Sequence, residues 1–222
     1  MTTAPFSQGP GAGRFISFEG PEGGGKSTQA KRLTERLERE FNLKVRFTRE
    51  PGGTPTGEMI RSILQHNAAG EPLCDPAEVF LFCASRAQLC QTVLAPALAR
   101  GEWVVSDRFT DSTLAYQGYG RGFDVKTLRA FNSFATGPVV PDVTFLLDVS
   151  SEVGLARVAS RTATGSKDRI ESEAIEFHRR LRDGYLAIAA EEPARFVVLD
   201  TARFNAEETA EAIWNVVSQR FL

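Results

Sequence analysis

Short apolar runs alternate along the chain with longer stretches in which apolar residues recur every three or four positions. The short runs predict β-strands, and the longer stretches predict amphipathic helices. The predicted strands cover residues 14–19, 44–48, 103–107, 143–148 and 195–200. The predicted helices cover residues 26–40, 56–65, 76–100, 124–136, 151–161 and 172–191, with a last helix after residue 205.

Several residues mark the ends of these predicted elements. Residues 51–53 (PGG) force a turn after the second strand. Asp124 is suited to cap the helix that follows it, and Asn205 with Glu208 three positions later resembles a capping box. Pro96 is expected to kink or end the long third helix, because proline lacks the N–H that a helix interior requires.

The order of elements predicts the fold class. Five strands separated by helices favour an α/β fold, with a five-stranded parallel sheet, right-handed crossovers and helices on both faces. The fourth strand, residues 143–148, is almost entirely apolar, as buried parallel strands are. The sequence has no internal repeat, long linker or break in composition, so we expect a single domain over residues 14–222.

Composition narrows the possible partners. The chain has 222 residues, of which 42% are hydrophobic and 24% are charged, and its formal net charge is −2. A near-neutral chain of this kind is not expected to coat nucleic acid or to bind membranes through basic residues. A small anionic ligand stays possible, because it needs only local positive charge.

The cysteines and the N-terminal segment indicate a compartment. Cys74, Cys83 and Cys90 include no CxxC pair, so we expect small buried hydrophobic side chains rather than disulfides or a zinc site. Residues 1–13 are rich in Gly, Pro and Ser and are expected to form a disordered tail without the features of a secretory signal. No apolar stretch approaches the ~20 residues of a membrane helix. These features together predict a cytoplasmic protein.

One motif carries specific chemistry. Residues 20–27 (GPEGGGKS) fit the pattern G-x-x-x-x-G-K-[ST] and lie between a predicted strand and a predicted helix, as that motif requires. The glycines let successive backbone N–H groups point at one anion, and the N-terminus of the helix adds positive charge. Lys26 would contact the β- and γ-phosphates of a nucleotide, and the Ser27 hydroxyl would bind Mg²⁺. The motif does not reveal the phosphoryl acceptor.

Arginines follow the same edge of the predicted sheet. Asp107 and Arg108 end the third strand, Arg49 ends the second, and Arg61 and Arg86 lie on the helices between these strands. Ligands of open α/β sheets bind at the carboxyl ends of the strands. Any one arginine could serve a surface ion pair instead, but together they predict a site with more than one phosphate group.

Several stretches of the sequence, including those with the phosphate loop and these arginines, resemble the thymidylate kinase family. The matching stretches run in order over nearly the whole chain: FEGPEGGGKST, TREPGGTPTGE, LFCASRAQ, DRFTDSTLAYQGYGRG, PDVTFLLDVS and DRIE…FHRRLRDGYL. The phosphate loop is generic, whereas TREPGG with the AYQG block is far more specific. The resemblance implies the three-layer P-loop nucleoside-monophosphate kinase fold, transfer of a phosphoryl group from MgATP to dTMP, and a homodimer that binds neither nucleic acid nor membrane.

The resemblance also implies residue roles for ATP, Mg²⁺ and catalysis. The implied ATP-binding residues are Gly20, Pro21, Glu22, Gly23, Gly24, Gly25, Lys26, Ser27 and Thr28. The implied Mg²⁺ ligands are Ser27, Asp107 and Glu22, and the implied catalytic residues are Lys26, Glu22, Arg108, Arg161 and Arg157. The acceptor is already close to a dianion at neutral pH, so no strong general base is needed.

For dTMP, the family pattern implies a phosphate end and a base end of the site. The implied dTMP-binding residues are Arg49, Glu50, Arg61, Phe82, Arg86, Arg108, Ser112, Thr113, Tyr116 and Gln117. Arg49 and Arg108 would hold the phosphate, Phe82 would stack on thymine, and Arg86 would hydrogen-bond the base. An aromatic ring beside an arginine suits a flat base with carbonyl edges. Core packing is the alternative role for Phe82, because residues 79–82 form an apolar run.

A basic segment is expected to form a mobile lid over about residues 157–171. Residues 157–182 contain seven basic and four acidic side chains, and the basic ones flank a small-residue loop at 162–166. Closure of such a lid would bring positive charge to the transferred phosphoryl group and exclude water. Some family members carry an arginine in the phosphate loop, where this chain has glycine, so we expect a lid arginine to be catalytic. The candidates are Arg161 and Arg157, followed by Lys167 and Arg169.

Two other functions fit parts of the same sequence. The first is a kinase for another nucleotide or nucleoside, such as dUMP, dGMP or thymidine. The second is a P-loop ATPase or switch that binds a macromolecule and transfers no phosphoryl group to a small molecule. The arginines at the acceptor edge argue against the second function.

Overall fold

The computed structural model describes residues 13–66, 71–161 and 173–222. The strands are β1 (Phe15–Glu19), β2 (Val45–Arg49), β3 (Trp103–Asp107), β4 (Val143–Asp148) and β5 (Phe196–Asp200). The α-helices are α1 (Lys26–Phe41), α2 (Pro55–His66), α3 (Asp75–Leu89), α4 (Ala95–Ala99), α5 (Thr110–Thr113), α6 (Val125–Thr136), α7 (Ser151–Arg161), α8 (Ile175–Glu191) and α9 (Ala206–Phe221). Two π-helical segments are η1 (Cys90–Leu94) and η2 (Leu114–Gly120). No helix within these ranges is both long and apolar enough to cross a membrane.

The strands form one parallel sheet in the order β2-β3-β1-β4-β5, which confirms the predicted fold class. Phe18 of β1 pairs in register with Asp107 of β3 and with Phe145 of β4. Arg49 of β2 is in register with the same Asp107. The carboxyl ends of β1, β2 and β3 therefore lie side by side, at the edge where ligands of such sheets bind.

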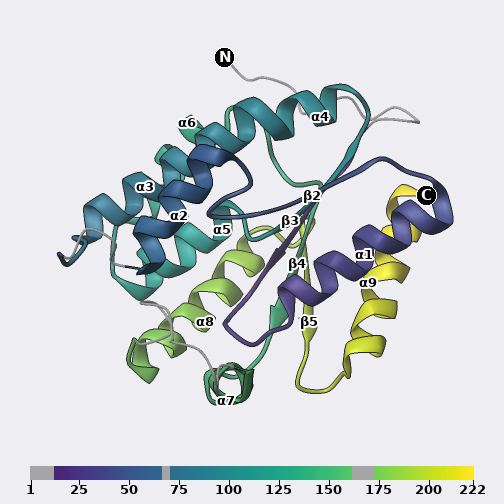
Figure 1. Cartoon of the computed structure of the whole chain (residues 1–222). Coiled ribbons are helices and arrows are strands. Elements are labelled where there is room, and N and C mark those ends of the chain that lie inside the picture. Colours follow the sequence, from purple (N-terminus) through teal and green to yellow (C-terminus); the bar gives the residue numbers. More distant parts are fainter. Residues whose placement is uncertain (1–12, 67–70, 162–172) are drawn as a thin grey trace.

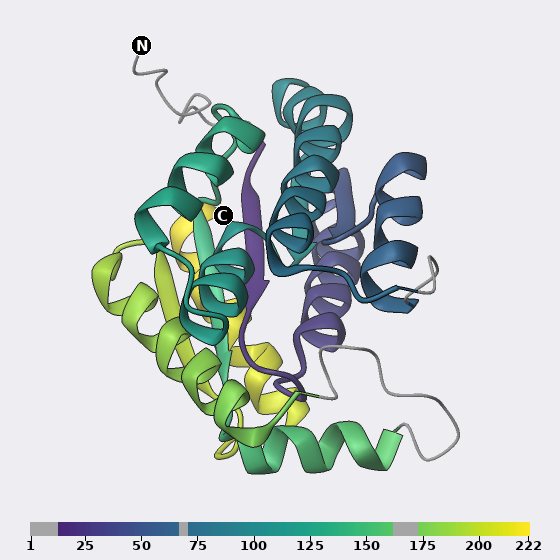
Figure 2. The same ribbon diagram turned by 90° about the vertical axis from the view of Figure 1, so that its left-hand side faces the viewer.

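Helices cover both faces of the sheet, and the strands supply apolar side chains to each. Ile16 and Phe18 of β1 pack in a cluster with Leu33 of α1 and Val217 of α9. Figure 1 shows α1 and α9 beside each other on that face. Phe15 faces the opposite side, because successive side chains of a strand alternate. Figure 2 looks onto this second face, where α3, α6 and α8 lie in front of the sheet.

The helix boundaries agree with most of the predicted signals. The side chain of Asp124 accepts a hydrogen bond from the backbone N–H of Thr127, and Asn205 with Glu208 forms a capping box. The chain stays helical up to Pro96, and the backbone N–H of Ala95 donates to the carbonyl of Cys90, as in a π-helix. The predicted change at Pro96 thus takes the form of a π-helical turn just before it, with the helix ending at Ala99.

Segment η2 was not among the predicted helices, because residues 114–120 have no clear helical periodicity. Its position depends on close packing against α8. A Cβ on Gly120 would lie 2.6 Å from the ring of Phe177, and one on Gly184 would lie 2.5 Å from the side chain of Tyr119. The absence of side chains at these two glycines lets η2 and α8 approach each other. This packing brings Tyr116 and Gln117 into the interior.

The expectation that all three cysteines are buried is wrong for one of them. Cys90 is buried and Cys83 is half-buried, but Cys74 is exposed at the N-cap position of α3. All three cysteines are free thiols.

Candidate active site

The phosphate loop connects β1 to α1 and lies against helix α7. Gly23 has a φ of +75° and Gly25 a φ of +91°, which are favourable only for glycine. A Cβ on Gly23 would lie 2.2 Å from the carbonyl oxygen of Gly154, and a Cβ on Gly154 would lie 2.2 Å from that of Glu22. The loop backbone is therefore in direct contact with the backbone of α7, and neither glycine has room for a side chain.

Lys26 begins α1 and folds back over the loop. Its side chain is nearly buried, and Nζ donates hydrogen bonds to the carbonyls of Gly20 (2.9 Å) and Pro21 (2.7 Å). Burial, and then the nearby charge of Arg108, lowers the pKa of Lys26 to about 8. The amine is therefore held inside the loop by these two carbonyls.

Ser27 and Asp107 form a pair that suits a divalent cation. Ser27 Oγ donates a hydrogen bond to Asp107 Oδ2, while Asp107 Oδ1 is buried and has no hydrogen-bond partner. A hydroxyl and a carboxylate with an unsatisfied oxygen fit Mg²⁺, which commonly takes few protein ligands and completes its shell with phosphate oxygens and water. No group of three His, Cys, Asp or Glu side chains in the described ranges is arranged to hold a metal alone.

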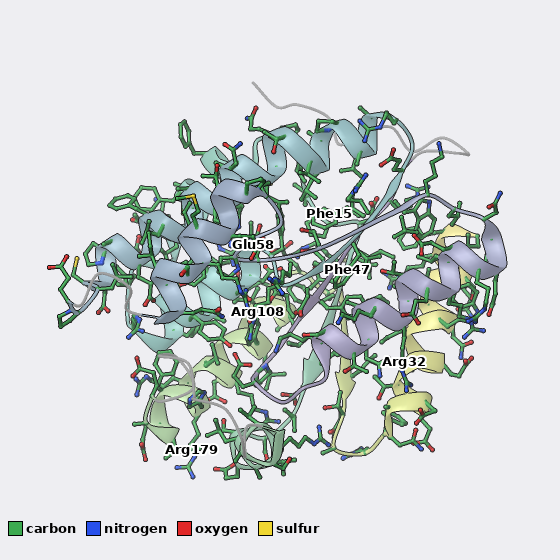
Figure 3. The ribbon with its side chains drawn as sticks, in the orientation of Figure 1. Phe15, Arg32, Phe47, Glu58, Arg108 and Arg179 are labelled. Atoms are coloured by element: carbon green, nitrogen blue, oxygen red, sulfur yellow. The ribbon has the colours of Figure 1, made fainter. Side chains whose placement is uncertain are left out.

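Arg108 follows β3 in a strained backbone conformation. Its φ is +73°, in the left-handed region that non-glycine residues rarely adopt. The backbone N–H of Arg108 donates to the carbonyl of Phe18 at 2.9 Å, and Ser106 Oγ donates to the carbonyl of Arg108 at 2.7 Å. These bonds offset a conformational cost of about 1–3 kcal/mol. Figure 3 shows Arg108 between the sheet and the helices, whereas Arg32 and Arg179 lie at the periphery.

The guanidinium of Arg108 links the phosphate loop to the second face of the sheet. Nη2 donates to Glu22 Oε1, which also accepts a hydrogen bond from the Tyr116 hydroxyl at 2.7 Å. Nη1 lies 3.3 Å from the hydroxyls of Ser112 and Tyr185. Burial alone would raise the pKa of Glu22, but the charges of Arg108 and Lys26 and the Tyr116 hydrogen bond lower it to about 2. Glu22 is therefore ionised and fixed in position.

Glu19, the last residue of β1, was not among the predicted site residues. It accepts hydrogen bonds from the backbone N–H of Phe109 (2.8 Å), the hydroxyl of Ser112 (2.6 Å) and the hydroxyl of Tyr185 (3.1 Å). It thereby holds the segment that follows Arg108. A carboxylate ending an apolar strand directly before the phosphate loop was the available signal. Burial, and then the charge of Asp111, raises the pKa of Glu19 to about 7.

This raised pKa predicts a pH-dependent stability. The pKa of Glu19 is 4.5 in the unfolded chain and about 7 in the folded chain. Between these two pH values the folded chain keeps a proton on Glu19 that the unfolded chain releases. The free energy of unfolding should therefore decrease as pH rises through this window, by on the order of 3 kcal/mol. Urea unfolding from pH 4.5 to 8 should show a steeper decrease in the native chain than in Glu19→Gln, in which the buried Glu50 still has a raised pKa. The exposed Glu35→Gln variant is the control, and an equal pH slope in native chain and Glu19→Gln would contradict the assignment.

A cavity of about 270 Å³ extends from the phosphate loop to α3 and η2. Most of the predicted acceptor-site residues line it. They are Arg49, Glu50, Arg61, Phe82, Arg108, Ser112, Thr113, Tyr116 and Gln117. Pro51, Leu64 and Gln65 also line it and were not predicted. Within the apolar run 79–82, Val79 is in the core and Phe80 is exposed, which leaves Phe82 facing the cavity.

Arg86 is placed differently from the other acceptor-site candidates. It is 1% exposed and is not among the residues that line the cavity. Its guanidinium forms an ion pair with Glu50 at 2.6 Å and donates to Thr113 Oγ1 (3.0 Å), Asn132 Oδ1 (2.6 Å) and the Phe109 carbonyl (3.2 Å). Nε also donates to Glu50 Oε2 at 2.8 Å, so each of the three guanidinium nitrogens has a hydrogen-bond partner within the protein. A hydrogen bond from Arg86 to a base would require one of these partners to be exchanged.

Of the four basic lid residues named as catalytic candidates, Arg157 is the one whose side chain is described. Arg157 Nη1 donates to the carbonyl of Gly23 at 3.3 Å, and Nη2 donates to the carbonyl of Thr201 at 2.9 Å. It therefore touches the phosphate loop. The side chain of Arg161, together with Lys167 and Arg169, lies outside the described residues, as does most of the predicted lid.

One edge of the parallel sheet carries the whole site. It holds the phosphate loop with its buried lysine, the hydroxyl–carboxylate pair and the arginine-lined cavity. The fold and the site together define a P-loop kinase of the nucleoside-monophosphate kinase type. The family model for thymidylate kinase matches residues 18–213. The chain belongs to the thymidylate kinase family.

Individual relatives cover nearly the whole chain. A thymidylate kinase of Solidesulfovibrio magneticus is 50% identical over 210 residues, which are 92% of this chain and 99% of the relative. One of Deinococcus radiodurans is 49% identical over 209 residues, covering 94% and 98%. The crystal structure of thymidylate kinase from Ehrlichia chaffeensis aligns with a TM-score of 0.76 at 33% identity, covering 93% of this chain and 99% of that one.

Proposed function

We propose that this protein transfers the γ-phosphoryl group of ATP to dTMP, giving dTDP and ADP for dTTP synthesis. The observation that carries the proposal is the cavity that joins the phosphate loop at Lys26 to an aromatic wall at Phe82, with Arg108 between them. A nucleoside monophosphate in this cavity would place its phosphate near Arg108 and its base near Phe82. Because ATP and dTMP are cytoplasmic metabolites, we also propose a cytoplasmic location.

The mechanism is direct transfer between two aligned phosphates. The phosphate loop and Lys26 would bind the β- and γ-phosphates of ATP, while Arg108 and Arg49 would orient the phosphate of dTMP. Since the acceptor oxygen is already largely ionised at neutral pH, the protein supplies position and positive charge rather than a strong base. Glu22 keeps the Arg108 guanidinium pointing at the junction of the two nucleotides.

Ser27 and Asp107 would hold Mg²⁺, with Glu22 as a further candidate close by. The unsatisfied Oδ1 atom of Asp107 supports this assignment. Bound Mg²⁺ would neutralise charge on the phosphate oxygens. Glu22 Oε1 is occupied by Arg108 and Tyr116, so Glu22 would contribute through its other oxygen or through water.

A panel of acceptors tests the proposed reaction. ADP release should be fastest with dTMP and should be compared for dUMP, dGMP and thymidine. A preference for another acceptor would replace dTMP with that substrate. ATP hydrolysis that no nucleoside monophosphate affects would favour the P-loop ATPase or switch instead.

The aromatic wall predicts a selective effect on the acceptor. Phe82→Ala should raise the KM for dTMP by about tenfold or more, because stacking of a base on an aromatic ring contributes about 1–3 kcal/mol. The KM for ATP should change little. Phe41→Ala, which removes an exposed aromatic ring at the C-terminal end of α1, is the matched control. A change confined to the KM for ATP would show that Phe82 has been assigned to the wrong nucleotide.

We propose that two copies of the chain associate through an apolar surface on α3 and α6. Phe80 is 58% exposed and lies 5.6 Å from the ring of Phe131, and Phe134 is 92% exposed on the same helix as Phe131. Contiguous exposed aromatic side chains are typical of interfaces.

Sedimentation velocity tests this association. The native chain should sediment as a dimer and Phe134→Glu as a monomer, because a buried glutamate would lack a partner at the interface. Val153→Glu, which changes an exposed apolar residue on α7, is expected to leave the dimer intact. A native chain that sediments as a monomer would exclude the dimer.

A further inference from the structure

Gln117 is a polar residue of the cavity, and its side-chain amide is oriented by a residue that does not line the cavity. Gln117 lines the cavity, while its side chain is almost fully buried. Its Nε2 donates a hydrogen bond of 2.7 Å to Glu78 Oε1. Glu78 is itself fully buried on α3 and does not line the cavity. Glu78 is therefore linked to the cavity through Gln117.

Arg121 keeps Glu78 in the state of a hydrogen-bond acceptor. Its Nε lies 2.9 Å from Glu78 Oε1 and its Nη2 lies 3.2 Å from Oε2, so both carboxylate oxygens face the guanidinium. Arg121 also pairs with Glu173 at 3.0 Å and lies 3.6 Å from Asp75. Both oxygens of Glu78 accept hydrogen bonds from this guanidinium, so Glu78 serves as an acceptor in this arrangement.

A carboxylate that can only accept fixes which end of the Gln117 amide faces it. If the amide were turned over, its carbonyl oxygen would lie against Glu78 Oε1, and two acceptors would meet in a buried site without a proton between them. The NH₂ group is thus directed toward Glu78. The carbonyl oxygen, at the other end of the same planar group, is left for the cavity.

We propose that Glu78 is a positioning residue that makes Gln117 a hydrogen-bond acceptor for the base, and so selects bases with an imide N–H over bases with a ring-nitrogen acceptor. This inference rests on the proposed function, in which the base of a pyrimidine nucleotide enters the cavity beside Phe82. Thymine and uracil carry an N–H at ring position 3, which would donate to the Gln117 carbonyl. Cytosine has an acceptor at that position and would face the carbonyl with a lone pair.

The test measures binding of dTMP and dCMP by isothermal titration calorimetry to the native chain and to Glu78→Gln. The substituted side chain has the same shape but carries an NH₂ group, which allows the Gln117 amide to turn over. The preference for dTMP over dCMP, expressed as the ratio of the two Kd values, should fall at least about tenfold, as expected for one mismatched buried hydrogen bond. Affinity for ATP should not change.

Two further variants separate positioning from general damage to the fold. Glu173→Gln removes another carboxylate from Arg121 without touching Gln117, so it should keep the native preference. The double variant Glu78→Gln/Gln117→Glu exchanges the amide and the carboxylate and again directs an acceptor oxygen to the cavity. It should restore most of the preference that Glu78→Gln loses, which a structural role for Glu78 would not explain.

The outcomes distinguish this inference from the proposed function. An unchanged preference in Glu78→Gln, a loss of equal size in Glu173→Gln, or a native chain without preference would overturn the role of Glu78. A native chain that prefers dTMP in binding but releases no ADP with it would overturn the proposed reaction, and the binding comparison would still decide the role of Glu78.

Discussion

Replacing Lys26 by alanine is expected to lower kcat by at least about a thousandfold. Removing one preorganised donor from a developing negative charge commonly costs about 10²–10³-fold, and Lys26 carries a full charge inside the phosphate loop. Its two present partners are the carbonyls of Gly20 and Pro21, which neighbouring loop N–H groups and water can satisfy in its absence. The fold should therefore persist, and loss of activity should reflect loss of chemistry.

Two measurements make this expectation decisive. The circular dichroism spectrum and the unfolding midpoint of Lys26→Ala should stay close to those of the native chain. Lys31→Ala removes an exposed lysine from the same helix and should leave kcat unchanged. Full turnover in Lys26→Ala would show that the phosphate loop is not where the transferred group is held.

Arg108→Ala is the second substitution with a large expected effect. Arg108 is the side chain that touches Glu22 of the loop and Ser112 beyond β3, so its loss removes the positive charge at the junction of the two proposed substrates. We expect kcat/KM for dTMP to fall by about 10²–10³-fold. Glu22 would keep its burial but lose its strongest partner, so its pKa should rise from about 2 and unfolding should become easier by about 1–3 kcal/mol.

The matched control for this substitution is Arg100→Ala. Arg100 is an exposed arginine that pairs with Glu102 at 2.9 Å, far from the cavity. It should change neither activity nor stability by a measurable amount. Activity of Arg108→Ala within threefold of the native chain would contradict the proposed role, whatever happened to its stability.

The features that could be predicted from the sequence are those determined by residues close together in the chain. The fourth strand was predicted at its observed bounds, because it is an uninterrupted apolar run. The phosphate loop was recognised because its glycines, Lys26 and Ser27 are consecutive in the chain. The cap at Asn205 depends on two residues three positions apart and was found for the same reason.

The features that could not be predicted depend on contacts between residues far apart in the chain. Glu19 belongs to the site because Ser112 and Tyr185, 93 and 166 residues away, donate to it. Arg86 faces Glu50, 36 residues before it, instead of the cavity. Segment η2 forms where Gly184 and Gly120 permit close packing against α8. The sequence of residues 114–120 has no periodicity from which this helix could be predicted. The sequence predicted which residue types gather at this edge, but the folded chain decides which of them point inward.

The contact between Gly23 and Gly154 restricts how this enzyme could change over evolutionary time. An arginine introduced at position 23 would have to adopt a φ of +75° and would collide with the backbone of α7. Placing an arginine in the loop would therefore need α7 to shift first, through substitutions elsewhere in the chain. The order of mutations is thus constrained by two residues that have no side chains, and ancestors with only one of the two changes should be rare.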